Sequence, residues 1–202
     1  APAGVTHIRV AIGQGGQGGG YGKDGYIHGS GTLPGSGVAA GYGEDGAPGL
    51  GGKVWYDSLT INAGQTFAVY IGKGGAAAVR KGDAGLEGEE TTFGVYSSAN
   101  GQRYANGYTD INSGDSYART GVASPAKGTS DGGAGGKGGD PGQGYYQQVF
   151  WTPDIPGYNG SNAGKPRGWK FVVTEQPGPG KPGKAGASGF VRIAWDKSEE
   201  TA

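Results

Sequence analysis

The sequence contains no cysteine and only two histidines among its 202 residues. The absence of cysteine excludes a disulfide scaffold and any metal site built from thiolates. The 17 basic and 17 acidic residues cancel, so the chain carries no net charge that would attract it to nucleic acid or to an anionic membrane. No apolar run approaches the roughly 20 residues of a membrane-spanning helix. We therefore expect no nucleic-acid partner and no membrane insertion.

Glycine is the residue present in excess, with 49 glycines where average usage predicts about 14. Together with 11 prolines, this composition is typical of a disordered chain. The sequence also has 4 tryptophans, 12 tyrosines and 5 phenylalanines, however, and disordered segments are poor in aromatic residues. Alternating apolar segments separate the glycines. We therefore expect an ordered fold, with flexible glycine-rich linkers as the alternative interpretation.

The glycines recur at every third position in five blocks. The blocks run from Gly13 to Gly25, Gly43 to Gly52, Gly82 to Gly88, Gly133 to Gly142 and Gly180 to Gly189. A period of three fits neither an α-helix nor a β-strand, but it is the repeat of the polyproline or polyglycine II helix. That helix has no internal hydrogen bonds, so glycine at every third residue lets neighbouring backbones approach and bond laterally. The spacing predicts a chain folded back and forth into a bundle of polyglycine II helices.

The first block also contains Gly13, Gly15 and Gly18 directly after a predicted strand, which is the spacing of a dinucleotide-binding turn. Such a turn needs a helix after the glycines, because the pyrophosphate binds at the helix N-terminus. The residues that follow, GGYGKDGYIHGSG, hold too many glycines for a helix. We therefore reject a nucleotide site and expect no cofactor.

Alternating apolar residues predict short β-strands around the glycine blocks. Four segments alternate in this way: residues 5–12, 55–61, 66–71 and 190–195. Two stretches, 93–128 and 144–173, break the glycine period, and we interpret them as loop insertions. The predicted fold class is mostly β or irregular, with short strands, a polyglycine II bundle and little or no α-helix. We expect a single glycine-rich domain spanning residues 1–202.

Several segments, taken in order, resemble the glycine-rich receptor-binding domain at the tips of bacteriophage tail fibres. The segments are PAGVTHIRVAIGQGGQGGG near the start, LTINAGQTFAVYIGKGG in the middle, TTFG at Thr91–Gly94, and GKAGASGFVRIAW near the end. The resemblance covers most of the chain, but residues 144–173 have no counterpart in that family. It implies a bundle of polyglycine II helices that displays variable loops to the host cell surface. It also implies a homotrimer attached to the rest of a fibre.

Catalysis has little support in the sequence. His7 lies in a predicted strand and His28 beside glycines, and neither belongs to a motif with a nucleophile or with metal-ligand spacing. We expect both imidazoles to face outward. The segment DINSGD at 110–115 has alternating oxygen ligands, but Gly121 occupies the twelfth position, where a calcium-binding EF-hand loop requires a carboxylate. An Asx-type turn fits the segment better, so we expect neither a catalytic nor a metal site.

The aromatic residues of the two insertions carry the strongest functional signal. Tyrosine combined with serine, glycine and asparagine is the composition of adaptable binding loops, because rigid rings give contact area at low entropic cost. The predicted receptor-binding residues are Arg103, Tyr104, Tyr108, Tyr117, Tyr146, Phe150, Trp151 and Tyr158. The alternative is that these rings cover the core or pack between subunits.

From the sequence we predict a non-enzymatic adhesin that attaches a fibre to a bacterial surface receptor, either a glycan or an outer-membrane protein. The predicted location is the tip of a virion tail fibre. Two alternatives remain: a purely structural cap on the fibre tip, and a surface adhesin of a bacterium with the same architecture. Polysaccharide hydrolysis is less well supported, because no pair of carboxylates can be placed about 5–10 Å apart from the sequence.

Overall fold

The computed structural model describes residues 1–29, 38–103, 120–150 and 166–196. Its contacts divide the chain into two compact units. Unit 1 comprises Ala1–Tyr21, Gly46–Gly136 and Pro182–Ala202, and unit 2 comprises Gly22–Asp45 and Lys137–Lys181. We describe each unit by itself.

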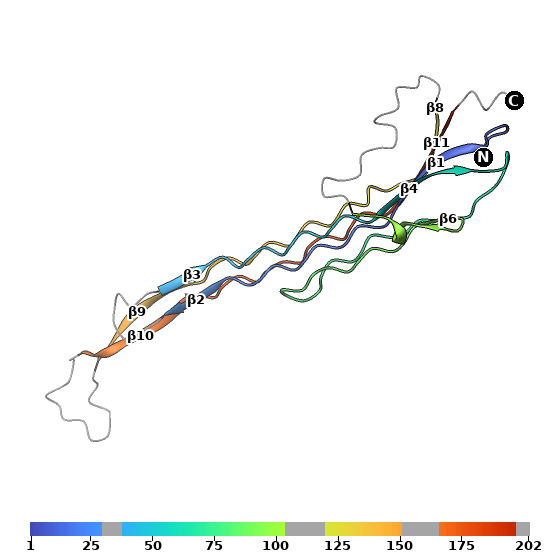
Figure 1. Cartoon of the computed structure of the whole chain (residues 1–202). Coiled ribbons are helices and arrows are strands. Elements are labelled where there is room, and N and C mark those ends of the chain that lie inside the picture. The colour runs from blue at the N-terminus through green and yellow to red at the C-terminus, as the bar shows by residue number, and fades with distance from the viewer. Residues whose placement is uncertain (30–37, 104–119, 151–165, 197–202) are drawn as a thin grey trace. The chain divides into compact units, whose positions relative to one another are not determined.

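Unit 1 contains an antiparallel sheet of four strands in the order β4-β1-β11-β8 (Figure 1). The strands are β1 (His7–Gly13), β4 (Val54–Thr60), β8 (Thr120–Lys127) and β11 (Phe190–Asp196). The central strand β1 pairs with β4 on one side, with Val10 opposite Asp57, and with β11 on the other, with Val10 opposite Ile193. Alternation therefore correctly predicted β1, β4 and β11, although these strands are far apart in the sequence.

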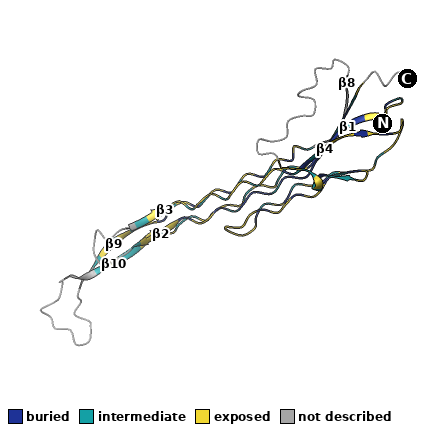
Figure 2. Cartoon of the chain, in the orientation of Figure 1, coloured by how far each residue is buried: buried dark blue, intermediate teal, exposed yellow. Residues whose placement is uncertain are grey.

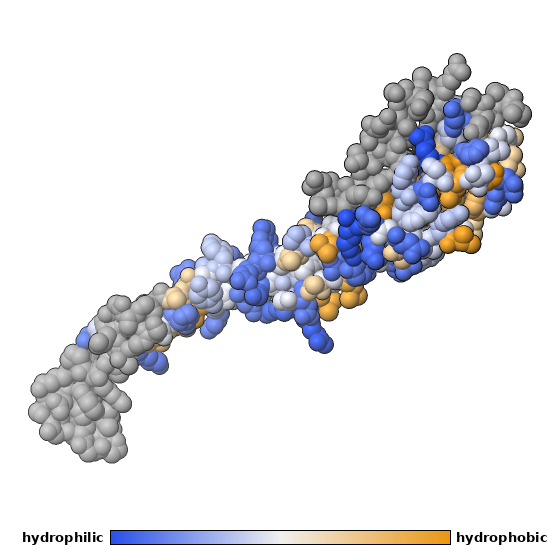
Figure 3. Space-filling view, viewed as in Figure 1, coloured by the Kyte–Doolittle hydropathy of each residue, from blue (hydrophilic) through white to orange (hydrophobic). Residues whose placement is uncertain are grey.

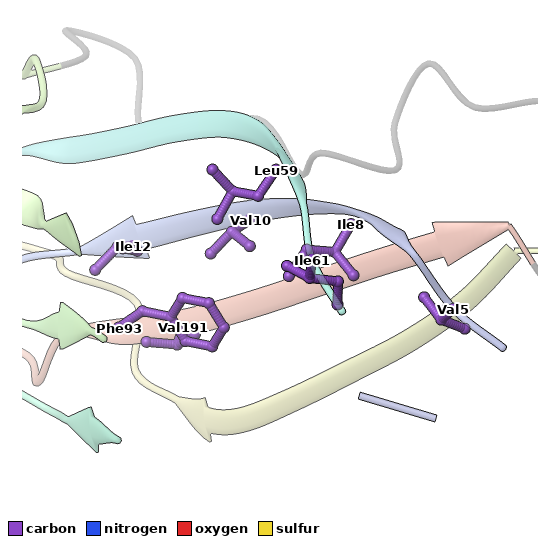
Figure 4. Packing of buried hydrophobic residues seen from close by; sticks show 8 residues of the cluster. All are labelled: Val5, Ile8, Val10, Ile12, Leu59, Ile61, Phe93 and Val191. Carbon is purple, nitrogen blue, oxygen red and sulfur yellow. The ribbon is translucent and has the colours of Figure 1, made fainter. Parts of the chain in front are cut away.

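One face of this sheet forms the hydrophobic core. The buried cluster comprises Val5, Ile8, Val10, Ile12, Leu59, Ile61, Phe93 and Val191 (Figure 4). Ile12, Val10 and Val191 are fully buried, and Figure 2 shows buried residues in dark blue along β1. Full burial of one such side chain contributes about 1.5–3 kcal/mol, so this cluster is the main apolar contribution in unit 1.

A second small sheet covers part of that face. It has the order β5-β6-β7, with β5 (Val69–Tyr70), β6 (Thr92–Phe93) and β7 (Tyr96–Ser97). The rings of Phe67 and Phe93 stack with centroids 4.4 Å apart. A short 3-10 helix, η1 (Ser98–Asn100), follows β7. The predicted strand at 66–71 is thus much shorter than its alternation suggested.

The glycine-rich parts of unit 1 are extended segments joined by backbone hydrogen bonds, without the ladders of a β-sheet. Residues 14–21, here called the central segment, bond to five others: residues 46–53, 72–78, 83–90, 130–136 and 182–189. Successive amides of the central segment donate in turn to three different neighbours. Gln14 donates to Lys53 at 2.8 Å, Gly15 to Glu89 at 3.0 Å and Gly16 to Ala187 at 2.9 Å. The same order repeats three residues later, from Gln17 onward.

Glycine is needed where these backbones touch. A Cβ atom on Gly16 would lie 1.9 Å from the carbonyl oxygen of Asp131, and one on Gly19 would lie 2.0 Å from that of Ala134. Neither backbone can retreat, because both are hydrogen-bonded on other sides. The three-residue glycine period therefore marks the positions that face a neighbouring backbone.

Two glutamine side chains bridge the gap between segments 46–53 and 83–90, here called the seam. Gln14 donates from Nε2 to the carbonyl of Gly88 at 2.9 Å, while its Oε1 accepts from the amide of Lys53 at 3.2 Å. Gln17 makes the matching pair, donating to Gly85 at 3.1 Å and accepting from Leu50 at 3.1 Å. The glutamine amides thus supply across the seam the donor and acceptor that another backbone segment would offer.

Unit 2 consists of similar extended segments and two hairpins. The hairpins are β2 (Tyr26–Gly29) with β3 (Val38–Gly41), and β9 (Gln143–Phe150) with β10 (Pro166–Glu175). Its segment 22–25 donates backbone bonds to two neighbouring segments. Gly22 donates to Lys181 at 2.9 Å and Gly25 to Gly178 at 3.0 Å, while Lys23 donates to Glu44 at 2.8 Å.

The described residues form small antiparallel sheets with no α-helix, which confirms the coarse fold class. In particular, no helix follows Gly18. Both stretches that the sequence marked as loop insertions contain strands, since β8 lies within 93–128 and most of β9 and of β10 lies within 144–173. Their sequences lack a clean apolar alternation because β9 and β10 form a narrow two-stranded sheet, which imposes little one-sided burial.

Candidate functional site

Most of the aromatic residues predicted to bind a receptor lie outside the described residues. Tyr104, Tyr108 and Tyr117 fall within 104–119, and Trp151 and Tyr158 fall within 151–165. The DINSGD segment at 110–115 lies there as well. The predictions for these residues stay predictions. The structure does describe the elements that flank both stretches.

The stretch 151–165 connects the two strands of the β9–β10 hairpin in unit 2. Phe150 is the last residue of β9 and pairs through its backbone with Pro166, the first residue of β10. The two strands pair from there to Gln143 and Glu175, with register shifts near both ends. The paired hairpin therefore places Phe150 and Pro166, which flank residues 151–165, opposite each other.

Tyr146 is used for packing inside unit 2. It lies opposite Phe171 across the hairpin, and the two ring centroids are 5.3 Å apart with a 57° tilt. Both rings lie against β2, because a Cβ atom on Gly29 would be 2.5 Å from Phe171 and 2.9 Å from the Tyr146 hydroxyl. The glycine at this position lets the two hairpins approach each other. The half-buried Tyr146 ring thus has a packing contact within unit 2.

The exposed ring on β9 belongs instead to Tyr145. Successive strand residues face opposite sides, so Tyr145 points away from the packing of Tyr146 and is 50% exposed. Two further exposed rings lie on or beside the other hairpin, Tyr26 and the 72% exposed Tyr42. Tyr145 belonged to the aromatic set of the insertions but was not among the predicted binding residues, since the sequence did not show which tyrosine faces outward.

The face of β2 that carries Tyr26 presents two rings side by side. Tyr26 and His28 have centroids 6.0 Å apart and planes within 26° of parallel. Tyr26 covers Gly41 of β3, where a Cβ atom would be 2.6 Å from the tyrosine hydroxyl. Both side chains are exposed, and His7 is exposed as well, which confirms the outward orientation expected for the two histidines.

Exposed ion pairs join the extended segments of unit 2. Lys23 Nζ lies 2.5 Å from the Glu44 carboxylate, and this hydrogen bond lowers the pKa of Glu44. Lys137 Nζ lies 2.7 Å from Asp45, which also accepts from the amide of Gly138 at 2.8 Å. The hydrogen bond from Lys137 is the main cause that lowers the pKa of Asp45, and the Gly138 amide adds to it. The same contact raises the pKa of Lys137.

A similar carboxylate lies in unit 1. Glu89 accepts from the Tyr70 hydroxyl at 2.6 Å and from the amide of Lys73 at 3.1 Å. The tyrosine hydrogen bond, with a smaller contribution from the amide, lowers the pKa of Glu89, and the carboxylate in turn raises the pKa of Tyr70. All of these groups are exposed and each has a structural partner, so their titration reports on contacts between segments.

Unit 1 also has an open apolar cleft of about 590 Å³ beside the core. It lies between the sheet and β5 and is lined by Ile8, Phe67, Val69, Phe93, Ile193 and Trp195, with Gln65 and Thr66 as polar members. A cleft of this size and lining can accept an apolar group. On the face drawn in Figure 3, hydrophobic and hydrophilic residues are otherwise interspersed.

Within the described ranges, no three histidine, aspartate or glutamate side chains gather closely enough to hold a metal ion. The described part of the chain likewise contains no helix with the length and hydrophobicity needed to cross a membrane. Arg103, the remaining predicted binding residue, donates to the backbone oxygen of Gly51 and forms an ion pair with Glu87. Both of these partners belong to unit 1.

Comparison with protein-family models, curated proteins and solved structures found no match for this chain. The likeness to tail-fibre tips therefore rests on the sequence segments alone.

Proposed function

We propose that this chain is a non-enzymatic adhesin that binds a bacterial surface receptor through exposed aromatic residues on the hairpins of unit 2. The observation that carries the proposal is the different environment of two adjacent tyrosines. Tyr146 packs against Phe171, whereas Tyr145 is half exposed on the opposite face. Exposed rings held by paired strands lose little entropy on binding and give large contact areas. Tyr26 and Tyr42 add exposed rings on the β2–β3 side.

We propose that residues 151–165 extend this surface, because they connect the two strands of the β9–β10 hairpin. Trp151 and Tyr158 are its candidate contacts, and Tyr104, Tyr108 and Tyr117 are those of residues 104–119. A few buried aromatic anchors dominate the binding energy of most interfaces. Presentation of several copies would multiply a weak site, in keeping with the homotrimer and the fibre partners that the tail-fibre resemblance implies.

We further propose that the glycine-rich segments are polyglycine II helices that form the rigid scaffold of the adhesin. The support is the threefold rotation of hydrogen bonds, in which Gln14, Gly15 and Gly16 donate to three different neighbours before the order repeats. A helix with three residues per turn and no internal bonds directs its amides in this way. Glycine at each third position permits the close approach.

The test is binding of labelled protein to a panel of bacterial strains, with Tyr145→Ala and Tyr146→Ala as a matched pair. Binding through the exposed ring predicts that Tyr145→Ala weakens strain-selective binding about tenfold or more with an unchanged melting curve. Tyr146→Ala is expected to lower the melting temperature, because it removes packing against Phe171. A Tyr104, Tyr108 and Tyr158 triple alanine variant tests the two undescribed stretches in the same assay.

One observation favours a second candidate, a structural cap that ends a fibre without binding a receptor. Tyr146, a predicted contact, is engaged in internal packing, as aromatic residues often are. A cap predicts no strain-selective binding by the wild type and predicts a loss of stability in the triple variant. Release of reducing ends from capsule or lipopolysaccharide would contradict both candidates, because it would indicate a hydrolase. The virion tail-fibre location is proposed from the resemblance alone, and a bacterium's own surface adhesin of the same architecture is the alternative.

A further inference from the structure

Arg103 joins two chain segments that lie on opposite sides of the seam. Its guanidinium donates to the carbonyl oxygen of Gly51 in segment 46–53 and to the carboxylate of Glu87 in segment 83–90. These are the two segments that Gln14 and Gln17 also bridge. Arg103 is therefore a third side chain that joins the two sides of the seam.

The two residues before Arg103 are held by the backbone. Gln102 exchanges both backbone hydrogen bonds with Val54, at 3.0 Å and 2.8 Å, outside the regular strands. Gly101 lies so close to the same residue that a Cβ atom there would be 2.2 Å from the Val54 carbonyl carbon. The amide of Gly101 also donates to Ser98 at 2.9 Å. Residues 101–103 thus make three consecutive contacts with the scaffold of unit 1.

Arginine suits this position for a geometric reason. The guanidinium presents five donors in a planar fork, so it can reach a carbonyl oxygen and a carboxylate in different directions at once. The Arg103 side chain is 31% exposed and the Glu87 side chain 54% exposed. Exposed ion pairs add little to global stability, so the effect of this one is expected to be local.

We propose that Arg103 is a positioning residue. It holds residues 101–103 against the seam and fixes the point from which residues 104–119 begin, and it does not itself contact the receptor. Thr120, where the described chain resumes, pairs with Asp196 in the four-stranded sheet, so the two residues that flank that stretch, Arg103 and Thr120, both have contacts within unit 1. The link to binding rests on the proposed function, whereas the anchoring is testable without any receptor.

The structural test is hydrogen exchange of the Gln102 amide, measured by NMR on the full chain. The proteins are the wild type, Arg103→Ala, Glu87→Ala and the double variant, with Arg80→Ala as a control for loss of an exposed arginine. Both single variants are expected to speed exchange about two- to fivefold. The double variant is expected to exchange no faster than Arg103→Ala, because both changes remove the same contact. Unchanged exchange in both single variants would overturn the proposal.

The binding test uses the same proteins on a strain that the wild type binds. A positioning role predicts that Arg103→Ala and Glu87→Ala weaken binding to a similar extent and that Arg103→Lys recovers only part of it, since an ammonium lacks the fork. Loss of binding in Arg103→Ala with normal binding and normal exchange in Glu87→Ala would overturn the proposal and make Arg103 a receptor contact. If the wild type binds no strain, the proposed function fails and the exchange data alone decide this proposal.

Discussion

The sheet of unit 1 and the extended segments beside it are stabilised by different parts of the chain. In the sheet, the fully buried side chains of Val10, Ile12 and Val191 make the core. In the segments, most of the buried positions are glycines, and neighbouring backbones contact each other directly through hydrogen bonds of 2.7–3.1 Å. The stability of the sheet is therefore more sensitive to changes in side-chain volume than to changes in the neighbouring backbone. The stability of the extended segments is more sensitive to changes in the neighbouring backbone than to changes in side-chain volume.

The largest effect is expected where a side chain is added between two backbones. In Gly52→Ala the new Cβ atom would lie 2.0 Å from the carbonyl oxygen of Gln14, whereas in Gly51→Ala the nearest atom is 3.6 Å away. Overpacking against a backbone that cannot move should cost Gly52→Ala at least about 3 kcal/mol in the free energy of unfolding. Gly51→Ala should stay within about 0.5 kcal/mol of the wild type. Urea denaturation compares the two, and equal stability would contradict the backbone-contact account.

A smaller loss is expected from removing a side-chain bridge across the seam. Gln14→Leu keeps the approximate volume but leaves the carbonyl of Gly88 and the amide of Lys53 without the Gln14 amide as partner. Because Gln14 is only 9% exposed, each unpaired group should cost about 1–3 kcal/mol. The same replacement at exposed Gln147 should change stability by less than about 0.5 kcal/mol. A Gln14→Leu protein as stable as the wild type would show that the bridge contributes nothing.

One position should gain stability when it becomes glycine. Ser130 has a left-handed φ of 56°, lies 4% exposed, and its hydroxyl has no hydrogen-bond partner among the described residues. A left-handed conformation costs a non-glycine residue about 1–2 kcal/mol, so Ser130→Gly should raise the free energy of unfolding by about 1 kcal/mol. Ser130→Ala, which removes the hydroxyl but keeps the strain, should gain less. Thermal melting of the three proteins would reveal a reversed order and so disprove the argument.

The smallest effect concerns acid. Contacts with Lys23 and Lys137 lower the pKa values of Glu44 and Asp45 below their ordinary 4.5 and 3.8. A carboxylate with a lowered folded-state pKa stabilises the fold above its unfolded-state pKa, and this contribution is lost as the pH falls through the lower, folded value. The protection of the Gly138 amide against hydrogen exchange, taken relative to the intrinsic exchange rate at each pH, should therefore fall below about pH 4. The Glu44→Gln and Asp45→Asn double variant should show a flatter pH profile, and an identical profile would contradict these assignments.

The sequence predicted the local features of the fold well. Alternation located β1, β4 and β11, because one buried face imposes a period of two. The glycine period located the segments whose backbones meet, although it missed residues 72–78, where Gly72, Gly75 and Ala78 keep the three-residue spacing with one alanine. The apolar alternation did not indicate that β9 and β10 pair, since a two-stranded sheet imposes no clear alternation on its strands.

The sequence by itself determined which residues need a small or an apolar side chain, and that the chain has no thiol chemistry and no net charge. Only the tertiary structure decided which glycine segments are neighbours, because all the blocks share one spacing and the pattern is compatible with many pairings. The same holds for the outward orientation of Tyr145, the packing of Tyr146 and the roles of Gln14 and Arg103. These depend on contacts between residues far apart in the sequence, such as the contact of Arg103 with Gly51, and local spacing carries no information about them.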